Sequence, residues 1–197
     1  MTSTTRIPPA DIGGIQGTIV KSLSKRKLGR VPESLGVMWH NQAVLKTLYG
    51  FFGKTEQWEA CDRQLKSFAH MAAVSLVGCS FCLDFGYFQA NDAKLDMAKA
   101  REVPRWRESD AFTPLERDVL EYAEAMTQTP PEVTDEMSAR LLNQLGAPGL
   151  LELTAFIAGA NMAARTNVAL GIEAEGFAEA CGLKPLQLPS SGVASPA

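Results

Sequence analysis

The sequence has little that would tie it to a nucleic acid or to a membrane. Its net charge is only −3, and its densest basic group, KSLSKRKLGR at 21–30, is typical of a solvated surface segment rather than of an anion or partner site. It lacks an uninterrupted apolar run of about 18 residues, the length that crosses a bilayer. Its first residues, MTSTTRIPPADIGG, lack the pattern of a signal peptide. We therefore expect a cytoplasmic protein without nucleic-acid or membrane partners.

Strand patterns are absent as well. No segment alternates polar and apolar residues between turn signals, as a half-buried strand does. Apolar residues over 56–77 instead recur at steps of three and four, the spacing of one helical face: Trp58, Cys61, Leu65, Phe68, Ala72 and Leu76. Gly78 interrupts this stripe, and a second helix is expected from Cys79 to about Ala90. The sequence therefore predicts an all-α fold, a single-domain helical bundle.

Capping residues mark two further helices. In FTPLERDVLEYAEAMTQ, Thr113 is the expected N-cap and Glu116 closes a capping box. In VTDEMSARLLNQLG, Thr134 repeats the cap and Gly146 is the expected stop. The last long helix, at about 149–172, is apolar nearly all round. Such a helix is expected at the centre of a bundle or at a subunit interface.

The chain length fits one domain with two tails. Its 197 residues are 46% hydrophobic and 21% charged, which is ordinary globular usage. Residues 1–30 form an expected N-terminal arm, in which prolines and glycines interrupt any long element. Residues 31–182 form the expected helical domain, and residues 183–197 a flexible C-terminal tail.

Two of the four cysteines, Cys79 and Cys82, lie three residues apart in GCSFCLDFGYFQA. Thiols in the cytosol are reduced by default, so such a pair is more often catalytic or metal-binding than structural. A position in the first turn of a helix stabilises a thiolate, which is the nucleophilic form. Residues three apart on a helix share a face, so the two thiols can form a disulfide with little backbone movement.

Two other interpretations of the thiol pair remain open. A zinc site needs a second pair of ligands, and the remaining candidates do not form one at close spacing: Cys61, Cys181, His40 and His70. We therefore expect neither a metal nor another cofactor. Alternatively, both cysteines are buried core residues, as free cysteines often are.

Several segments, in order, resemble the alkylhydroperoxidase D-like, carboxymuconolactone decarboxylase superfamily. MAAVSLVGCSFCLDFG resembles its core motif, VPESLGVMWHNQAVLKTL its upstream helix, TPLERDVLEYAEAMT its following helix and NMAARTNVALGIEAEGF its C-terminal helix. The resemblance covers roughly residues 31–182. It implies a helical subunit that forms trimers or hexamers. It also implies reduction of a small peroxide with an external thiol or dithiol, where Cys82 resembles the attacking thiol and Cys79 the resolving one.

The sequence departs from the peroxidase pattern of this family at two positions. The family's histidine, four residues after the second cysteine, is replaced by Gly86, and its glutamate, twelve residues before the first, by Ser67. A general acid or base contributes about 10²–10⁴-fold to a rate. His70, one helical turn after Ser67, is our hypothesis for a substitute base or thiolate partner. The alternative is a partly buried histidine bonded to a carbonyl.

Other polar residues have structural explanations. Asp84 is expected to be a solvated or capping carboxylate rather than an acid, Tyr87 to pack in the core rather than approach Cys79, and His40 to be structural. Asn161 and Arg165 are four apart on the last helix. Because an arginine on an apolar helix needs partners, we expect an internal ion pair with a glutamate; the alternative is a site for a substrate carboxylate.

Three functions compete on the sequence. The first is a thiol-dependent oxidoreductase, which reduces a hydroperoxide through Cys82 and Cys79 with His70 as candidate base. The second is a decarboxylase-type enzyme that acts on a small lactone or carboxylate without the thiols. The third is a non-catalytic helical assembly or binding protein. Both cysteines favour the first, the missing proton relay favours the third, and the family's decarboxylases generally lack the thiol pair.

Overall fold

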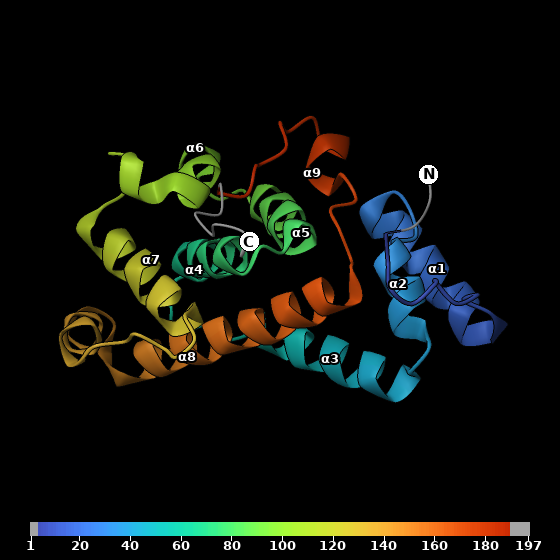
Figure 1. Ribbon diagram of the computed structural model, residues 1–197, viewed down its shortest axis with the longest axis horizontal. Helices are drawn as coiled ribbons and strands as arrows, with labels where there is room; N and C mark the ends of the chain where they lie inside the picture. Colours follow the sequence, from blue (N-terminus) through green and yellow to red (C-terminus); the bar gives the residue numbers. More distant parts are fainter. Residues whose placement is uncertain (1–3, 190–197) are drawn as a thin grey trace, which may run out of the picture.

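The computed structural model describes residues 4–189, and every regular element in this range is a helix (Figure 1). The all-α prediction is therefore confirmed. The elements, in chain order, are α1 (Gly14–Leu28), α2 (Glu33–Trp39), α3 (Gln42–Thr55), α4 (Arg63–Val77), α5 (Ser80–Asp92), α6 (Met97–Glu102), the 3-10 helix η1 (Val103–Glu108), α7 (Pro114–Thr127), α8 (Asp135–Leu170) and α9 (Phe177–Ala180).

Helix α4 is the centre of the bundle. It packs against α5, α7 and α8, which surround it in Figure 1. Side chains from these helices form one continuous core, in which Phe68 and Met71 of α4, Leu120 of α7 and Ile157 of α8 are fully buried. Complete burial of such side chains stabilises the fold by about 1.5–3 kcal/mol each. The core thus fixes α4 and α5, which carry the two cysteines and His70.

The turn from α4 into α5 sets the position of the thiol pair. Gly78 has φ of +82°, a left-handed conformation that glycine adopts without strain. The N–H groups of Gly78 and Cys79 both donate to the carbonyl of Val74, at 3.1 and 3.0 Å, as at a helix end closed by a left-handed residue. Cys79 then becomes the N-cap of α5. Helix α4 begins later than the apolar stripe predicts, since Asp62 caps it at Arg63.

The predicted caps of α7 and α8 are confirmed, and α8 is interrupted at the expected glycine. Thr113 and Glu116 form a capping box, and Thr134 caps α8. Gly146 leaves helical geometry, with φ 69° and ψ 171°, yet the helix resumes at once. Pro148 follows it, and proline suits the first turn of a resumed helix. The element α8 thus consists of two helices that meet at a kink, as the sequence predicts.

Only one face of α8 is covered within this chain. Leu153 and Ile157 are fully buried, whereas Leu151 is 71% and Met162 42% exposed. Among the described helices, α8 is also the one long and apolar enough to cross a membrane. Length and composition do not distinguish such a helix from the central helix of a bundle.

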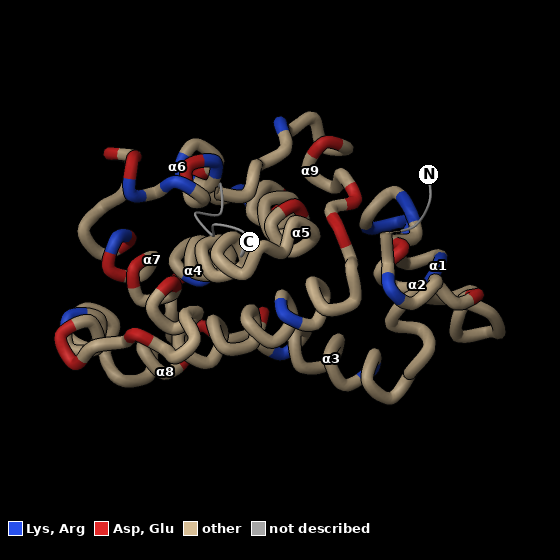
Figure 2. The backbone as a smooth tube through the Cα atoms, in the orientation of Figure 1, with Lys and Arg blue, Asp and Glu red and all other residues tan. Residues whose placement is uncertain are grey.

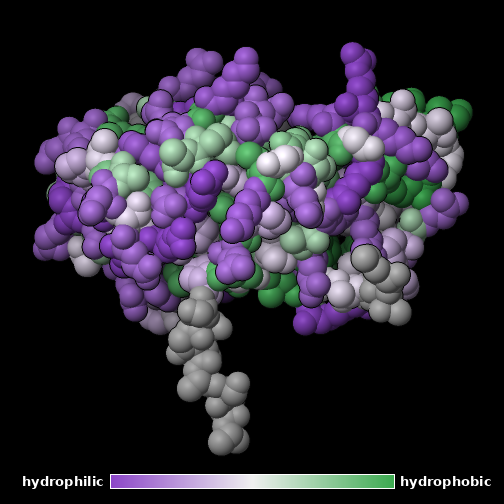
Figure 3. Space-filling view, turned by 90° about the horizontal axis from the view of Figure 1, so that it is seen from above, coloured by the Kyte–Doolittle hydropathy of each residue, from purple (hydrophilic) through white to green (hydrophobic). Residues whose placement is uncertain are grey.

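The N-terminal arm contains a 15-residue helix, α1, which corrects the expectation of no long element there. Gly13 is the N-cap and Gly14 the first residue, so both lie at the helix start, where they do not interrupt it. Gly17 is inside, where a Cβ would lie 2.6 Å from the carbonyl oxygen of Ile12. Helix α1 carries exposed apolar side chains, among them Ile15 at 82%, and it lies at the end of the molecule that is deeper green in Figure 3.

The rest of the arm is tied to the helical domain. The backbone N–H of Arg6 donates to the carbonyl of Leu170 at 2.9 Å, and Nε2 of His40 lies 2.8 Å from the carbonyl oxygen of Pro8. His40 is therefore structural, as expected. Of the predicted tail, residues 190–197 lie outside the described part of the chain.

Candidate functional site

Cys79 and Cys82 lie at the buried N-terminus of α5. Their sulfur atoms are bonded to each other, and their Cα atoms are 5.3 Å apart, within the usual range for a disulfide. Sγ of Cys79 also accepts a hydrogen bond from the backbone N–H of Cys82, at 3.2 Å. Cys79 is fully buried and Cys82 is 5% exposed. Both residues are therefore buried, Cys82 slightly less so than Cys79.

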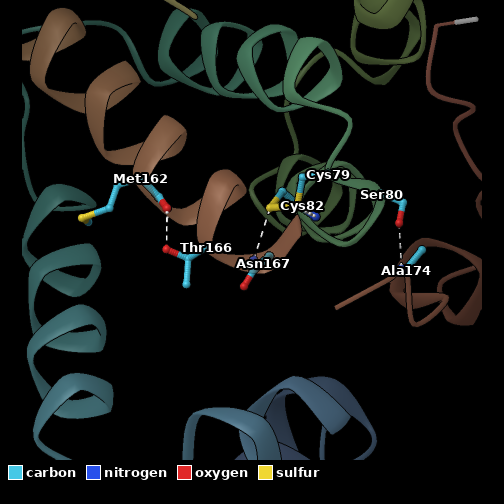
Figure 4. The surroundings of a disulfide bond; sticks show 7 residues. All are labelled: Cys79, Ser80, Cys82, Met162, Thr166, Asn167 and Ala174. Atoms are coloured by element: carbon cyan, nitrogen blue, oxygen red, sulfur yellow. Dashed lines mark hydrogen bonds between the residues drawn. A yellow bond between two sulfur atoms is a disulfide. The ribbon is translucent and has the colours of Figure 1, made fainter. Parts of the chain in front are cut away.

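Asn167 is the polar side chain that contacts the pair. Its Nδ2 donates to Sγ of Cys82 at 3.3 Å, across from the last turns of α8 (Figure 4). Sequence reasoning missed this residue, although a signal was present. Ile157, Ala160, Ala164 and Asn167 follow each other at steps of three and four and are all buried. A single amide at the end of an apolar stripe needs a polar partner.

His70 lies on α4 against the backbone of Gly86. A Cβ at Gly86 would lie 2.9 Å from Nδ1 of His70 and 3.0 Å from its Cε1. The imidazole therefore fills the space in which the family's histidine side chain would begin. Its ring also makes an edge contact with Phe156, with centroids 6.5 Å apart.

The environment of His70 keeps it neutral. Burial lowers its pKa to about 4. Between residues 4 and 189, no hydrogen bond joins His70 to a carbonyl or to either sulfur. The carbonyl-bonded alternative is therefore not observed. The structure places His70 beside Gly86, one turn of α5 beyond Cys82, without a polar contact to the thiol pair.

A buried ion pair lies on the same side of α4. Nζ of Lys66 is 2.6 Å from Oε1 of Glu152, and Oε2 of Glu152 accepts from the N–H of Ala60 at 2.7 Å. Burial acts to raise the pKa of Glu152, but hydrogen bonds from Lys66 and the backbone outweigh it and the pKa is lowered. Both oxygens are thus engaged in holding the segment before α4. This carboxylate does not replace the glutamate that is missing at Ser67.

Polar residues of α5 hold the chain that follows α8. Asp84 accepts hydrogen bonds from the N–H groups of Phe177 and Ala178, both at 2.9 Å, so it caps α9, as the capping interpretation predicted. Ser80 accepts from the N–H of Ala174 at 3.1 Å. Tyr87 is 1% exposed and packs in the core, as expected. The segment between α8 and α9 is therefore fastened next to the disulfide.

Glu175, one of the acidic residues in that same segment (Figure 2), connects it to the start of α2 and to Arg30. The carboxylate of Glu175 accepts from the N–H groups of Glu33 and Ser34, at 3.0 and 3.2 Å. Arg30 lies 3.9 Å from this carboxylate and stacks over the ring of Phe177. The start of α2 is thus joined to the region beside the thiols.

Arg165 does not form the ion pair expected from sequence. Its Nη2 donates to the carbonyl of Thr127 at 2.9 Å and to Oγ1 of Thr129 at 3.1 Å. Asn161 donates to Oγ1 of Thr127 at 2.9 Å. Because the end of α7 exposes carbonyl oxygens, the guanidinium finds acceptors there without a glutamate. In the part of the chain described here, no three His, Cys, Asp or Glu side chains form a group that could hold a metal ion.

Comparisons with known proteins find similar sequences and structures. Residues 42–125 match the model of the carboxymuconolactone decarboxylase family. The chain is also 36% identical over 116 residues to the uncharacterized protein YnjA of Escherichia coli K12, a match that covers 59% of this chain and 64% of YnjA. The alignment thus spans less than two thirds of that relative.

Solved structures share the fold. A variant of the debrominase Bmp8 in complex with 2,3,4-tribromopyrrole superposes with a TM-score of 0.76 at 22% identity, over 91% of this chain and 95% of Bmp8. ATU0492 of Agrobacterium tumefaciens, described as a putative antioxidant defence protein AhpD, has a TM-score of 0.66 at 18% identity, over 70% and 94% of the two chains. Residues 42–125 are thus similar to the carboxymuconolactone decarboxylase family, and the chain shares the fold of these solved structures.

Proposed function

We propose that this protein is a thiol-dependent oxidoreductase that reduces a small hydroperoxide through Cys82 and Cys79. The observation that carries the proposal is the bonded sulfur pair at the first turn of α5. A helix N-terminus stabilises a thiolate. The slight exposure of Cys82, against the complete burial of Cys79, supports Cys82 as the attacking sulfur.

The proposed reaction has three steps. The Cys82 thiolate attacks one peroxide oxygen, the O–O bond breaks, and a proton converts the leaving alkoxide to an alcohol; Cys82 is oxidised to a sulfenic acid. The Cys79 thiol then attacks the sulfenic sulfur, which releases water and forms the disulfide. An external dithiol finally reduces the disulfide by thiol exchange and leaves as its own disulfide.

We assign the proton transfer to His70. A neutral imidazole at pH 7, as a pKa of about 4 implies, can accept the thiol proton and return it to the alkoxide. The best catalytic base has a pKa near the working pH, so a low pKa makes His70 a weak one. We therefore expect its contribution to be near the lower end of the usual range, about 10²-fold. Its place against Gly86 supports the assignment.

The test is consumption of a small hydroperoxide that depends on an added dithiol. The wild type is expected to turn over, Cys82→Ser to be inactive, and Cys79→Ser to react once and stop at the sulfenic acid. Cys181→Ser is the matched control, because Cys181 is an exposed free cysteine, and it should keep the wild-type rate. Equal rates in the wild type and Cys82→Ser would contradict the proposal.

The same assay separates the rival functions when other substrates replace the hydroperoxide. Consumption of 2,3,4-tribromopyrrole, the ligand of the Bmp8 variant, that is lost in Cys82→Ser would keep the thiol mechanism and change the substrate. Turnover of a lactone that survives loss of both thiols would instead support the decarboxylase alternative. Absence of any turnover would leave a binding or assembly role.

A further inference from the structure

The two sulfurs differ in what donates to them. Sγ of Cys79 accepts from a backbone N–H, which any residue at position 82 except proline would supply. Sγ of Cys82 accepts from the side chain of Asn167, and this donor is specified by the sequence. Asn167 is 8% exposed, and its own backbone carbonyl accepts from the N–H of Ile172 at 3.0 Å. The backbone of Asn167 is therefore fixed at the end of α8, and its side chain is buried there.

The orientation of the Asn167 amide follows from chemistry. A disulfide sulfur has no hydrogen to donate, so only the NH₂ group can form a hydrogen bond with it. In Figure 4 the amide nitrogen faces Cys82 and the oxygen points away. A neutral sulfur is a weak acceptor, whereas a thiolate is charged. The same contact therefore becomes stronger when the disulfide is reduced and Cys82 loses its proton.

We infer that Asn167 is a positioning residue for Cys82, whose amide N–H stabilises the Cys82 thiolate of the reduced protein and so favours Cys82 over Cys79 as the attacking sulfur. The role of Asn167 in catalysis rests on the proposed function, in which Cys82 is the attacking sulfur. The effect of this hydrogen bond on the pKa of the reduced Cys82 thiol is measurable without any substrate.

In the described part of the chain, the charged side chains near this site have other hydrogen-bond partners, including Arg6, which donates to the carbonyls of Val168 and Ala169. On α5, both oxygens of Asp84 are engaged in capping α9. On α8, Arg165 donates to the end of α7. On α4, His70 is neutral and lies against Gly86. Among residues 4–189, Asn167 is thus the side chain whose hydrogen bond reaches the Cys82 sulfur.

The test measures the pKa of the Cys82 thiol in reduced protein. A background of Cys79→Ser and Cys181→Ser isolates Cys82, since the serine keeps an N-cap oxygen at position 79 and Cys61 is buried with a pKa raised to about 11. The ultraviolet absorbance of the thiolate and the rate of alkylation are followed against pH. Circular dichroism checks that each variant is folded.

Three variants at Asn167 and Asn161 should change the pKa of the Cys82 thiol by different amounts. Asn167→Leu removes the donor at similar volume, so it should raise the thiol pKa and slow alkylation at neutral pH about tenfold. Asn167→Asp faces the sulfur with a carboxylate and should raise the pKa further. Asn161→Leu removes an amide that bonds Thr127 instead, and it should leave the thiol pKa unchanged.

The ordering separates an electrostatic role from a structural one. An unchanged pKa in Asn167→Leu, or equal shifts in the leucine and aspartate variants, would overturn the inference. If the leucine variant does not fold, Asn167→Asp is used instead. An unchanged pKa of the Cys82 thiol beside that carboxylate would overturn the inference as well. The expected pKa shifts in the Asn167 variants, together with a wild type that consumes no hydroperoxide, would contradict only the proposed function.

Discussion

The imidazole of His70 occupies the space that any side chain at Gly86 would need. A Cβ at position 86 would lie 2.9 Å from Nδ1 of His70, closer than real Cβ contacts come. A histidine at 86 and the present position of His70 therefore exclude each other. The absence of a histidine at position 86 and the presence of His70 are therefore linked, because the two side chains would occupy the same space.

This exclusion predicts that the effect of Gly86→Ala changes sign with the residue at 70. In a helix, alanine is better than glycine by about 1 kcal/mol, but overpacking costs about 1–3 kcal/mol. We expect Gly86→Ala to lower the free energy of unfolding by about 1 kcal/mol in the wild type and to raise it by about 1 kcal/mol in His70→Ala. Denaturant unfolding of the four proteins in the cycle measures both. Additive effects would contradict the packing argument.

The low pKa of His70 predicts a pH dependence of stability. Its pKa falls from 6.5 to about 4 because burial disfavours the charged form. Above about pH 6.5, His70 is neutral in both the folded and unfolded states and adds no pH dependence. As the pH falls from 6.5 towards 4, the unfolded chain takes up a proton that the folded chain does not. Stability should then fall, by up to about 3 kcal/mol.

The matched control is His70→Gln, which cannot be protonated. Its free energy of unfolding should lose this part of the pH dependence, and the two curves should converge above about pH 6.5. The chain has two histidines, so the variant also assigns the imidazole signals in a proton NMR titration. A His70 signal that titrates at its ordinary value would show that the ring is not desolvated.

The buried ion pair predicts a large cost for removing one partner. Lys66 is 4% and Glu152 9% exposed. Glu152→Gln leaves the ammonium of Lys66 without its counter-charge and should lower the free energy of unfolding by about 3–5 kcal/mol. Asp118→Asn is the comparison, since Asp118 pairs with the exposed Arg140; it should cost less than about 1 kcal/mol. Similar costs in urea unfolding would contradict the assignment.

The free cysteines should react in a fixed order. Burial, with a smaller effect from Glu152, raises the pKa of Cys61 to about 11, whereas Cys181 is exposed. At neutral pH almost no Cys61 is thiolate, so alkylation of the folded protein should label Cys181 first and Cys61 only after unfolding. Mass spectrometry of peptides after short labelling measures the order. Early labelling of Cys61 would show that this thiol is accessible in the folded protein and would contradict the prediction.

Local signals in the sequence predicted local structure well. The caps at Thr113 and Thr134 and the thiol pair at the start of α5 depend on residues a few positions apart, and the structure has them as expected. Gly146 likewise interrupts α8 where the sequence predicts a helix to stop, since its φ of 69° and ψ of 171° are not helical.

The parts of the site that the sequence did not predict depend on distant contacts. Asn167 and Cys82 are 85 residues apart, and only the packing of α8 against α5 brings them together. The partners of Arg165 were predicted wrongly, because the carbonyl of Thr127 becomes available only where α7 ends beside α8. Likewise, the fit of His70 against Gly86 requires the packed pair α4 and α5.

The most direct measurement of redox activity in the thiol pair is a count of free thiols before and after one equivalent of a small hydroperoxide. The chain has four cysteines, so fully reduced, unfolded samples should show four thiols. After treatment of the folded wild type we predict two, with Cys79 and Cys82 joined in a disulfide peptide, and no such peptide in Cys82→Ser. Four thiols remaining in the wild type would contradict a redox role for this pair.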